Sequence, residues 1–308
     1  MSTDRRFLVV SHTGRSDSVD AAIDVCARLR AAGVGVVLPE SEHNDLRRAA
    51  GTLAGVRLLG TDVEAAELEA AIVLGGDGTI LRAAELVRGT RAPLVGVNLG
   101  HIGFLAESER EDLAETVTRV LARDYDVEER MTLSVRVKVG TAVVWESWAL
   151  NEAAVEKAAR ERMLEIVMEI DGRPLSSFGC DGVVVSSPTG ATAYAFSAGG
   201  PVVWPDLDAM LVVPLSAHAL FARPLVVSPD SAVAVEILDR TPGTGVLWCD
   251  GRRTFDLPPR ARVVVRRSGV PVRLARLSHG TFTDRLVRKF ALPVAGWRGP
   301  ADEERPGR

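Results

Sequence analysis

The pattern of apolar residues changes near Asp124, and this change constrains the fold more than any other feature of the chain. Before it, short apolar runs such as Phe7 to Val10 alternate with segments of helical periodicity such as Ser18 to Ala32. Such alternation predicts a parallel sheet covered by helices. After it, apolar residues recur at every second position, as in residues 133–139 and 164–170, which predicts β-strands. We therefore expect an α/β domain with a Rossmann-like parallel sheet, followed by a mostly β domain built as a layered β-sandwich.

The length of 308 residues favours two domains, because single cores rarely grow beyond about 250–300 residues. We place the α/β domain at residues 1–125 and the β domain at residues 126–280. For residues 281–308 we expect a helical segment that packs back on the first domain and then a mobile tail, rich in Gly, Pro and charge. Within the β domain, Asp171-Gly172 and Asp250-Gly251 predict hairpin turns.

Charge and cysteine content exclude several classes of partner and site. The net charge of -4 offers no broad positive field, so we expect neither nucleic acid nor a membrane as a partner. The apolar run after Arg5 and Arg6 is too short for a signal peptide or a membrane span. The three cysteines are far apart and lack the spacing of a zinc site or a disulfide framework, so we expect a cytoplasmic protein.

A glycine turn with one carboxylate, Gly75-Gly76-Asp77-Gly78-Thr79, joins a predicted strand to a predicted helix. Glycines let the backbone approach a ligand closely, and the first amides of the helix attract anions, so we expect these glycines and Thr79 to contact phosphate. Asp77 repels phosphate unless a divalent cation intervenes or the carboxylate takes a proton, which indicates catalysis or metal binding. The alternative is an ordinary strand-to-helix turn in which Asp is the N-cap.

Three other stretches carry groups suited to a nucleotide. Asn151 and Glu152 follow a strand-like segment and supply an amide and a carboxylate that can grip a ribose diol. Residues 187–194 supply hydroxyls, backbone N–H groups and a tyrosine ring face, and the loop 98–105 joins glycines to Phe104. Each stretch also has a purely structural interpretation: a solvated strand end, a tightly packed helix of small residues, and a core phenylalanine.

These motifs together, and in this order, resemble the NAD kinase family. The motifs are GGDGT, NLGHIGFL at residues 98–105, NE at 151–152, the DG of Asp181-Gly182 and SPTGATAY at 187–194. Segments similar to the family also occur at residues 197–201, 218–224 and 250–251, so the resemblance covers most of the chain. GGDGT alone occurs in diacylglycerol, sphingosine and phosphofructo-type kinases as well, whereas SPTGATAY followed by SAGGP is similar to NAD kinases only.

The resemblance implies transfer of the γ-phosphoryl group of ATP to the 2'-hydroxyl of the adenosine ribose of NAD, giving NADP, with Mg²⁺ or another divalent cation. It assigns the general base to Asp77. It assigns NAD contacts to Gly78, Phe104, Asn151, Glu152, Asp181, Thr192, Ala193, Tyr194, Ser197 and Asp250. It further implies a homodimer or homotetramer. It leaves open the metal ligands, the contacts to ATP, the use of polyphosphate in place of ATP, and the acceptance of NADH.

Other functions fit the sequence less well. A lipid kinase would share only GGDGT, and SPTGATAY counts against it. A non-catalytic dinucleotide sensor leaves Asp77 without a role. The chain has no G-x-x-x-x-G-K-S/T sequence, which disfavours a P-loop enzyme, and no G-x-G-x-x-G after the first strand, which disfavours a nicotinamide dehydrogenase. One departure from the family's Thr-Pro-Thr-Gly-Ser run is Ala191, where a lost hydroxyl would weaken a ligand contact by about 1 kcal/mol.

Overall fold

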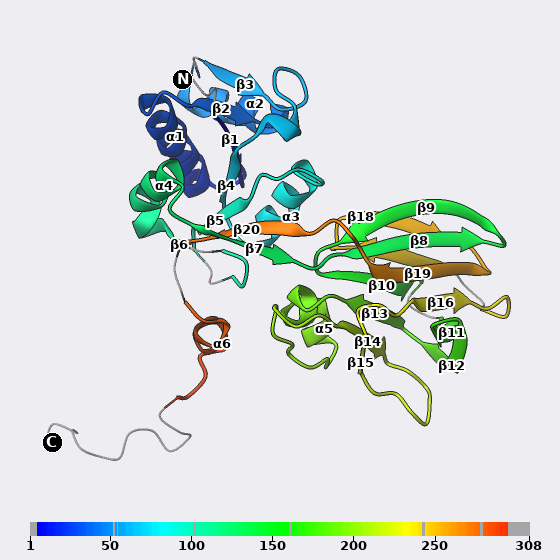
Figure 1. Cartoon of the computed structure of the whole chain (residues 1–308). Helices are drawn as coiled ribbons and strands as arrows, with labels where there is room; N and C mark the ends of the chain where they lie inside the picture. The colour runs from blue at the N-terminus through cyan, green and yellow to red at the C-terminus, as the bar shows by residue number, and fades with distance from the viewer. Residues whose placement is uncertain are drawn as a thin grey trace, which may run out of the picture. The chain divides into compact units, whose positions relative to one another are not determined.

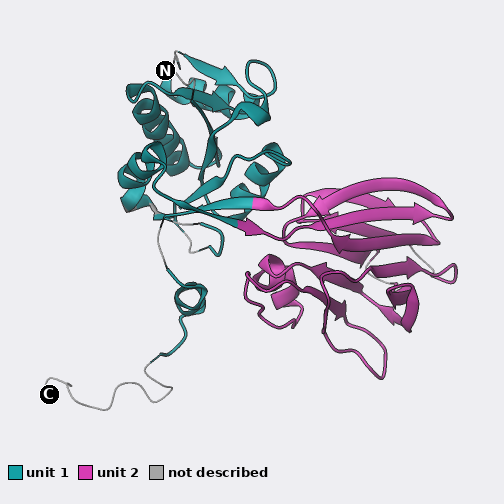
Figure 2. Ribbon diagram, in the orientation of Figure 1, with its two compact units in different colours: residues 1–128, 273–308 teal, residues 129–272 magenta. Residues whose placement is uncertain are grey.

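The structure is a computed structural model that describes residues 5–294 except 52, 54, 101, 102, 107, 160, 161, 242, 243, 278 and 279. The tail that we predicted to be mobile, from residue 296 onward, lies outside the described residues. The chain divides into two compact units (Figure 2): unit 1 comprises residues 1–128 and 273–308, and unit 2 comprises residues 129–272. The chain passes from one unit to the other within two strands, β7 (Asp126–Arg130) and β20 (Val272–Arg276).

Unit 1 is built on a mostly parallel sheet with the strand order β3-β2-β1-β4-β5-β20-β7, and β6 pairs with β5 (Figure 1). Its other strands are β1 (Arg6–Ser11), β2 (Gly35–Leu38), β3 (Val56–Leu58), β4 (Ala70–Leu74), β5 (Leu94–Asn98) and β6 (Ser108–Glu109). Its α-helices are α1 (Ser16–Ala31), α2 (Glu40–Ala50), α3 (Asp77–Leu86), α4 (Leu113–Ala122) and α6 (Phe282–Phe290), with short 3-10 turns η1 (Ala65–Glu67) and η2 (Arg110–Asp112). The parallel sheet expected from the alternating pattern is confirmed.

Burial on both faces explains why the central strands of unit 1 are continuous apolar runs. Every residue of β4 and β5 is buried, as is typical of parallel strands between two layers of helices. Helix α1 contributes Ala22, Val25 and Leu29, which are completely buried in the same core as β1, β4 and β5. The strand order reverses between β1 and β4, and in open α/β sheets ligands bind beyond the carboxyl ends of the strands at this reversal.

Unit 2 contains two six-stranded antiparallel sheets, ordered β15-β14-β13-β10-β17-β18 and β12-β11-β16-β19-β8-β9. The strands are β8 (Leu133–Val139), β9 (Ala142–Ala149), β10 (Glu152–Lys157), β11 (Leu164–Ile170), β12 (Arg173–Cys180), β13 (Gly182–Ser186), β14 (Met210–Leu215), β15 (Leu225–Val227), β16 (Val233–Ile237), β17 (Gly245–Cys249), β18 (Arg253–Leu257) and β19 (Ala261–Arg267). One core joins side chains of both sheets, so the expected layered β-sandwich is confirmed. Leu133, Val135 and Val137 lie in that core with no exposed area, as their period of two predicted.

A short helical segment covers the outer face of the β10-β13-β14 part of unit 2. It consists of the 3-10 turn η3 (Thr189–Thr192) and helix α5 (Tyr194–Ser197). Ala191 and Ala195 from this segment pack with Ala154 and Val184 in a second, smaller core. The small side chains of Ala191 and Ala195 let the segment lie close to the sheet, while Tyr194 and Phe196 remain partly exposed.

The end of the described chain returns to unit 1. Strand β20 pairs in parallel with β5, and the ring centroids of Phe282 and Phe290 in α6 both lie 5.9 Å from that of Phe104. This agrees with the expectation that the C-terminal segment packs back on the first domain. No helix among the described residues is long and apolar enough to cross a membrane.

The Glu69 carboxylate links the segments that precede β1 and β4 at the amino ends of these strands. Arg5 binds it with two hydrogen bonds of 2.7 and 2.6 Å, and Arg123, which follows α4, adds two of 2.8 and 3.0 Å. Burial alone would raise the pKa of Glu69, but the hydrogen bonds from the two arginines lower it to about 2.

We predict that Glu69→Gln lowers the free energy of unfolding by roughly 1–2 kcal/mol at pH 7. The folded pKa lies below the ordinary value of 4.5, so the carboxylate stabilises the fold above about pH 4.5 and loses this effect as the pH falls toward 2. Urea unfolding at several pH values should therefore show the gap between wild type and variant closing in acid. Glu115→Gln, on the exposed side of α4, is the control, and a gap that is constant with pH would contradict the prediction.

Candidate active site

An ion pair made by the buried Glu42 carboxylate fixes the point at which the chain leaves β1. The Glu42 carboxylate accepts a hydrogen bond of 2.6 Å from the backbone N–H of Ser11 and lies 2.7 Å from the guanidinium of Arg82. Arg82 also donates to the carbonyl oxygen of Ser11 at 2.8 Å. Burial raises the pKa of Glu42, and the charge of Arg82 opposes this effect. The three residues tie α2 and α3 to the carboxyl end of β1.

The glycine turn after β4 has a shape that only glycine permits at its first position. Gly75 has a φ of 151°, and a Cβ there would lie 2.5 Å from Oγ1 of Thr79. Gly76 is the N-cap of α3, and its carbonyl accepts the N–H of Thr79 at 2.9 Å. Asp77 is therefore the first residue of α3, and Gly78 is the second, with open space where a side chain would be.

The Asp77 side chain crosses to the loop after β5. Its two carboxylate oxygens accept hydrogen bonds of 3.1 Å from the backbone N–H groups of Phe104 and Leu105. A Cβ on Gly103 would lie 2.3 Å from Oδ1 of Asp77, so the loop can approach this closely only with glycine there. An ionised carboxylate has about four lone-pair sites, so each oxygen keeps acceptor capacity for a further partner. Phe104 itself is buried against α6.

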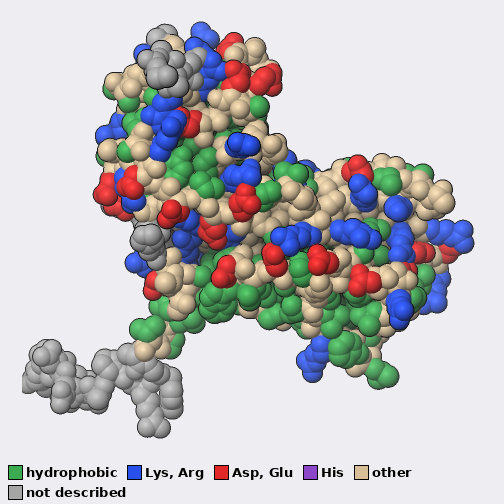
Figure 3. Space-filling model, in the orientation of Figure 1, with side chains coloured by type: hydrophobic (Ala, Val, Ile, Leu, Met, Phe, Trp, Pro, Cys, Tyr) green, Lys and Arg blue, Asp and Glu red, His purple; other side chains and the backbone are tan. Residues whose placement is uncertain are grey.

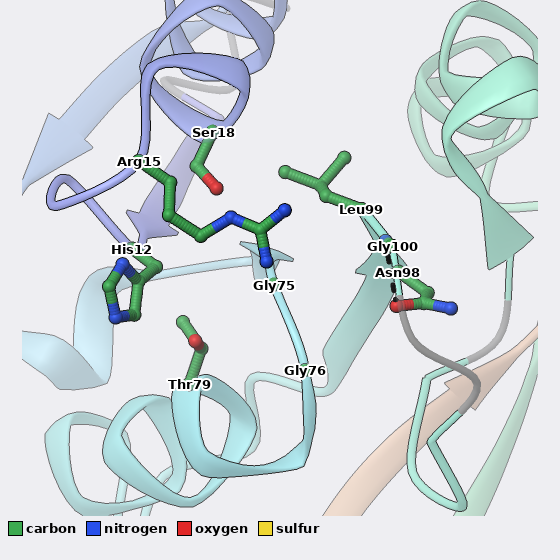
Figure 4. A pocket seen from close by; sticks show the side chains of 9 residues that line it. All are labelled: His12, Arg15, Ser18, Gly75, Gly76, Thr79, Asn98, Leu99 and Gly100. Atoms are coloured by element: carbon green, nitrogen blue, oxygen red, sulfur yellow. Dashed lines mark hydrogen bonds between the residues drawn. The ribbon is translucent and has the colours of Figure 1, made fainter.

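A cavity of about 170 Å³ opens at the carboxyl ends of β1, β4 and β5 (Figure 4). Its lining comes from the segments that follow these strands and from α1 and α3, namely His12, Arg15, Ser18, Gly75, Gly76, Thr79, Asn98, Leu99 and Gly100. In Figure 4 the guanidinium of Arg15 reaches from the start of α1 across the cavity toward Leu99 and Gly100. It is held by Asp17, at 2.8 Å, and its side chain is half exposed. The cavity thus offers a cation and a close backbone approach to an anionic ligand.

The sequence indicated the glycine turn and the loop at 98–105 but not the first loop, His12 to Ser18. That loop has no glycine motif, and its importance depends on β1 lying next to β4, which is a property of the sheet order. The one signal in the sequence is Arg15 itself, a basic residue directly before the first helix.

In unit 2, the Asp250 carboxylate holds the turn that contains Asn151 and Glu152. One oxygen accepts the backbone N–H groups of Asn151 at 2.7 Å and Glu152 at 3.3 Å. The other accepts the N–H of Leu150 at 2.9 Å and a guanidinium N–H of Arg253 at 2.7 Å. Asp250 has a φ of 54° at the corner of the β17-β18 hairpin, so the predicted Asp-Gly turn also delivers a buried side chain.

The SPTG part of SPTGATAY packs directly on the same turn. The hydroxyl of Ser187 donates to the carbonyl of Leu150 at 2.5 Å, and its backbone N–H donates to the carbonyl of Asn151 at 2.9 Å. The hydroxyl of Ser186 also donates to Asn151, at 3.1 Å. A Cβ on Gly190 would lie 2.3 Å from the carbonyl oxygen of Asn151. The two motifs are therefore one structural unit.

Glu152 is a buried acid in the turn on which residues 187–190 pack. Only 7% of the residue is exposed, and among the described residues its Oε2 has no hydrogen-bond partner. The backbone N–H of Tyr194 donates to its carboxyl group. Burial and the nearby Asp250 carboxylate raise the pKa of Glu152 to about 8. The Tyr194 hydroxyl donates to Glu156, so its ring lies along β10; burial and this hydrogen bond raise the pKa of Tyr194.

The structure brings some of the predicted NAD contacts of unit 2 together and places others apart. Asn151, Glu152, Asp250 and the start of α5 meet at one end of β10. Asp181 lies at the other end, because β10 pairs Glu152 with Ser186 and Glu156 with Gly182, which separates the ends by about 13 Å. Lys157 binds Asp181 at 2.5 Å, and this hydrogen bond lowers the pKa of Asp181. The remaining predicted contacts lie half-buried or exposed on η3, on α5 and at the residue between them: Thr192, Ser197 and Ala193.

Two family models match the chain: the ATP-NAD kinase N-terminal domain over residues 7–125 and the ATP-NAD kinase C-terminal domain over residues 150–277. The chain is 71% identical over 300 residues to an NAD kinase of Leifsonia xyli, and the alignment covers 97% of this chain and 99% of the relative. It is 59% identical over 298 residues to NAD kinase 2 of Streptomyces coelicolor, which covers 96% and 97%.

Two solved structures have the same fold. The yeast NADH kinase complexed with NADH matches with a TM-score of 0.80 and 21% identity, over 99% of this chain and 90% of that one. An NAD kinase from Archaeoglobus fulgidus in complex with ATP matches with a TM-score of 0.67 and 24% identity, over 93% and 98%.

We predict that Gly190→Ala destabilises unit 2 by about 1–3 kcal/mol, because the new methyl group would collide with the Asn151 carbonyl and the Ser186 hydroxyl. Urea unfolding measures the loss. Gly269→Ala is the matched control, since a Cβ there meets no atom within 4 Å, and it should change stability by less than about 0.5 kcal/mol. Equal stabilities of the two variants would show that the motifs are not packed as described.

Proposed function

The chain belongs to the NAD kinase family, and we propose that it transfers the γ-phosphoryl group of ATP to the 2'-hydroxyl of the adenosine ribose of NAD, giving NADP. The observation that carries this proposal is the Asp77 carboxylate, held at the start of α3 by the loop after β5, next to a cavity that suits an anion. The curated relatives of similar length are named NAD kinases, and the two structural neighbours were solved with NADH and with ATP.

Asp77 is the proposed general base. Phosphoryl transfer needs an oriented hydroxyl, in-line geometry and charge stabilisation more than covalent catalysis. The two backbone N–H groups fix the carboxylate and leave acceptor sites on both oxygens, so the group can accept the proton of the 2'-hydroxyl. The fixed orientation removes rotamer freedom before the substrate arrives.

We place the triphosphate of ATP at the glycine turn and its cavity, with contacts from Gly75, Gly76, Gly78 and Thr79. The position at the reversal of strand order, the open space beside Gly76 and Gly78, and the guanidinium of Arg15 support this placement. Polyphosphate presents the same phosphate oxygens as the triphosphate of ATP, so the proposal extends to polyphosphate as an alternative donor.

Mg²⁺ is the proposed metal. No group of three or more His, Cys, Asp or Glu side chains in the described part of the chain could hold a metal ion. Mg²⁺ is commonly bound through substrate phosphates with few protein ligands, so this chain fits an ion that arrives with ATP. When bound, the ion neutralises charge on the phosphates during transfer.

We assign NAD binding mainly to the cluster that Asn151, Glu152 and Tyr194 form in unit 2. The buried amide and carboxyl suit the acceptor ribose, and the exposed part of the Tyr194 ring suits adenine. Further proposed contacts, taken from the family resemblance, are Gly78, Phe104, Asp181, Thr192, Ala193 and Ser197. Asp250 takes part through the turn that it holds.

We further propose a homodimer or homotetramer in the cytoplasm. Hydrophobic side chains gather along the lower side of unit 2 in Figure 3, over β14 and β15, and Leu220, Phe221 and Val226 are each more than half exposed. Apolar patches of this kind mark interaction surfaces. Cys26, Cys180 and Cys249 are free and buried, which suits a reducing compartment.

We predict that the purified protein makes NADP from NAD, ATP and Mg²⁺, and that Asp77→Asn lowers kcat by about 10²–10⁴-fold, because an amide cannot take the proton. An enzyme-coupled NADP assay measures both. Asn can accept only one of the two N–H groups that hold Asp77, so the melting temperature should fall modestly, and a fold that is intact at the assay temperature separates loss of the base from loss of the fold.

The same assay tests the alternatives. Full activity of Asp77→Asn would remove Asp77 as the base. NAD binding without turnover on ATP or polyphosphate would indicate a dinucleotide sensor, and phosphorylation of a lipid alcohol would indicate a lipid kinase. Parallel reactions with NADH in place of NAD define the acceptor.

We predict that Arg15→Met raises KM for ATP about tenfold or more with a smaller change in KM for NAD, because it removes a cation from the proposed triphosphate cavity. Steady-state kinetics with each substrate varied in turn measures the KM for ATP and the KM for NAD separately. Arg28→Met, on the outer side of α1, is the control and should leave both constants unchanged. An unchanged KM for ATP in Arg15→Met would move the donor site elsewhere.

A further inference from the structure

The Asp250 side chain has no capacity left for a ligand. An ionised carboxylate has about four lone-pair sites, and Asp250 already accepts from the N–H groups of Leu150, Asn151 and Glu152 and from Arg253. Only 6% of the residue is exposed. The Arg253 guanidinium is itself held in place, 4.5 Å above the ring of Trp148. Asp250 therefore acts on NAD through the turn that it binds.

The hydrogen-bond partners of Asp250 favour the ionised form of its side chain. All four are donors, so a proton on either oxygen would displace one of them and find no acceptor. Burial raises the pKa of Asp250, and the backbone hydrogen bonds from Leu150 and Asn151 and the charge of Arg253 oppose this rise. We therefore treat Asp250 as the ionised member of the pair that it forms with Glu152.

Glu152 has the opposite environment. It accepts one backbone N–H, from Tyr194, and its Oε2 faces no donor among the described residues. The titratable groups that interact with it are the Asp250 carboxylate, the Cys249 thiol on β17 and the Tyr194 hydroxyl on α5, and none of these carries positive charge. The Arg253 cation is bound to Asp250. Burial and the Asp250 charge raise the pKa of Glu152 to about 8, so the acid is mostly neutral at pH 7.

We propose that Asp250 is a positioning residue that keeps Glu152 protonated, so that Glu152 binds the ribose of NAD as a neutral acid, both donating and accepting a hydrogen bond. The inference rests on the proposed function, since it takes NAD as the ligand. A ribose diol offers donors and acceptors on adjacent oxygens, and a neutral carboxyl group presents the complementary pair, whereas a carboxylate can only accept. The free Oε2 is the atom that carries the proton.

A proton-linked binding equilibrium follows. If only neutral Glu152 binds NAD tightly, the free protein loses its binding-competent form as the pH rises above 8, and NAD binding must then take up a proton. Below about pH 7 no proton is exchanged. The dissociation constant should rise about tenfold for each pH unit well above 8.

Isothermal titration of NAD into the full-length protein at pH 6.5 to 9.5, in two buffers of different ionisation enthalpy, tests this linkage. Wild type should approach uptake of one proton per NAD at high pH. Glu152→Gln keeps a donor and an acceptor but cannot ionise, so it should bind NAD several-fold more weakly at pH 7 and show no uptake at any pH. Asp239→Asn, an exposed carboxylate of unit 2 paired with Arg260, is the control and should keep the wild-type profile.

Asp250→Asn tests the positioning role. Removing the negative neighbour makes Glu152 easier to ionise, so proton uptake and the rise in dissociation constant should begin at a lower pH, by about one unit. Circular dichroism checks its fold, and if the variant does not fold, the Glu152→Gln comparison still decides whether Glu152 is the group that takes up the proton. Wild type without proton uptake, or uptake that persists in Glu152→Gln, would overturn the inference even if NADP is formed. Normal linkage without NADP formation would instead overturn the proposed kinase activity.

Discussion

Carboxylates that accept backbone N–H groups from turns distant in the sequence hold the functional segments of both units in shape. Asp77 binds the loop after β5, Glu42 binds the end of β1, and Asp250 binds the turn before β10. Removing a carboxylate from water without such donors would be strongly unfavourable. Each hydrogen bond therefore restricts both the carboxylate and the turn that donates to it. The shape of each motif is thus set by a residue that lies outside it.

These bonds explain the pattern of small residues around them. Gly103 lies against the Asp77 carboxylate and Gly190 against the Asn151 carbonyl, and at each position a methyl group would come within 2.3 Å of an oxygen. The glycines therefore permit close approach between protein segments as much as approach to a ligand. The sequence allowed two interpretations of SPTGATAY, a tightly packed segment of small residues or part of a ligand site. Both apply, because the residues that pack on the Asn151 turn also form the candidate site.

The sequence was most informative where the structure is local. The strand and helix around GGDGT, the period of two in β8 and β11, and the Asp-Gly corners follow from apolar spacing and backbone preference within a few residues. Strand β7, with the sequence DVEER, has almost no apolar signal and is a strand because it lies at the edge of a sheet with β20 beside it. The place of Arg15 and the partners of Asp250 likewise depend on strand order and on residues about one hundred positions away.

The contrast between Glu152 and Asp250 shows why residue type alone does not define a site. Both are buried carboxyl groups at one end of β10, yet one is surrounded by four donors and the other receives a single N–H. Environments that drive two neighbouring acids toward different protonation states are characteristic of sites that handle protons or polar ligands. In this protein the charge that opposes ionisation of Glu152 belongs to the same residue that fixes its backbone. Asp250 therefore contributes to both the position and the protonation of Glu152, together with burial, which raises the pKa of Glu152 further.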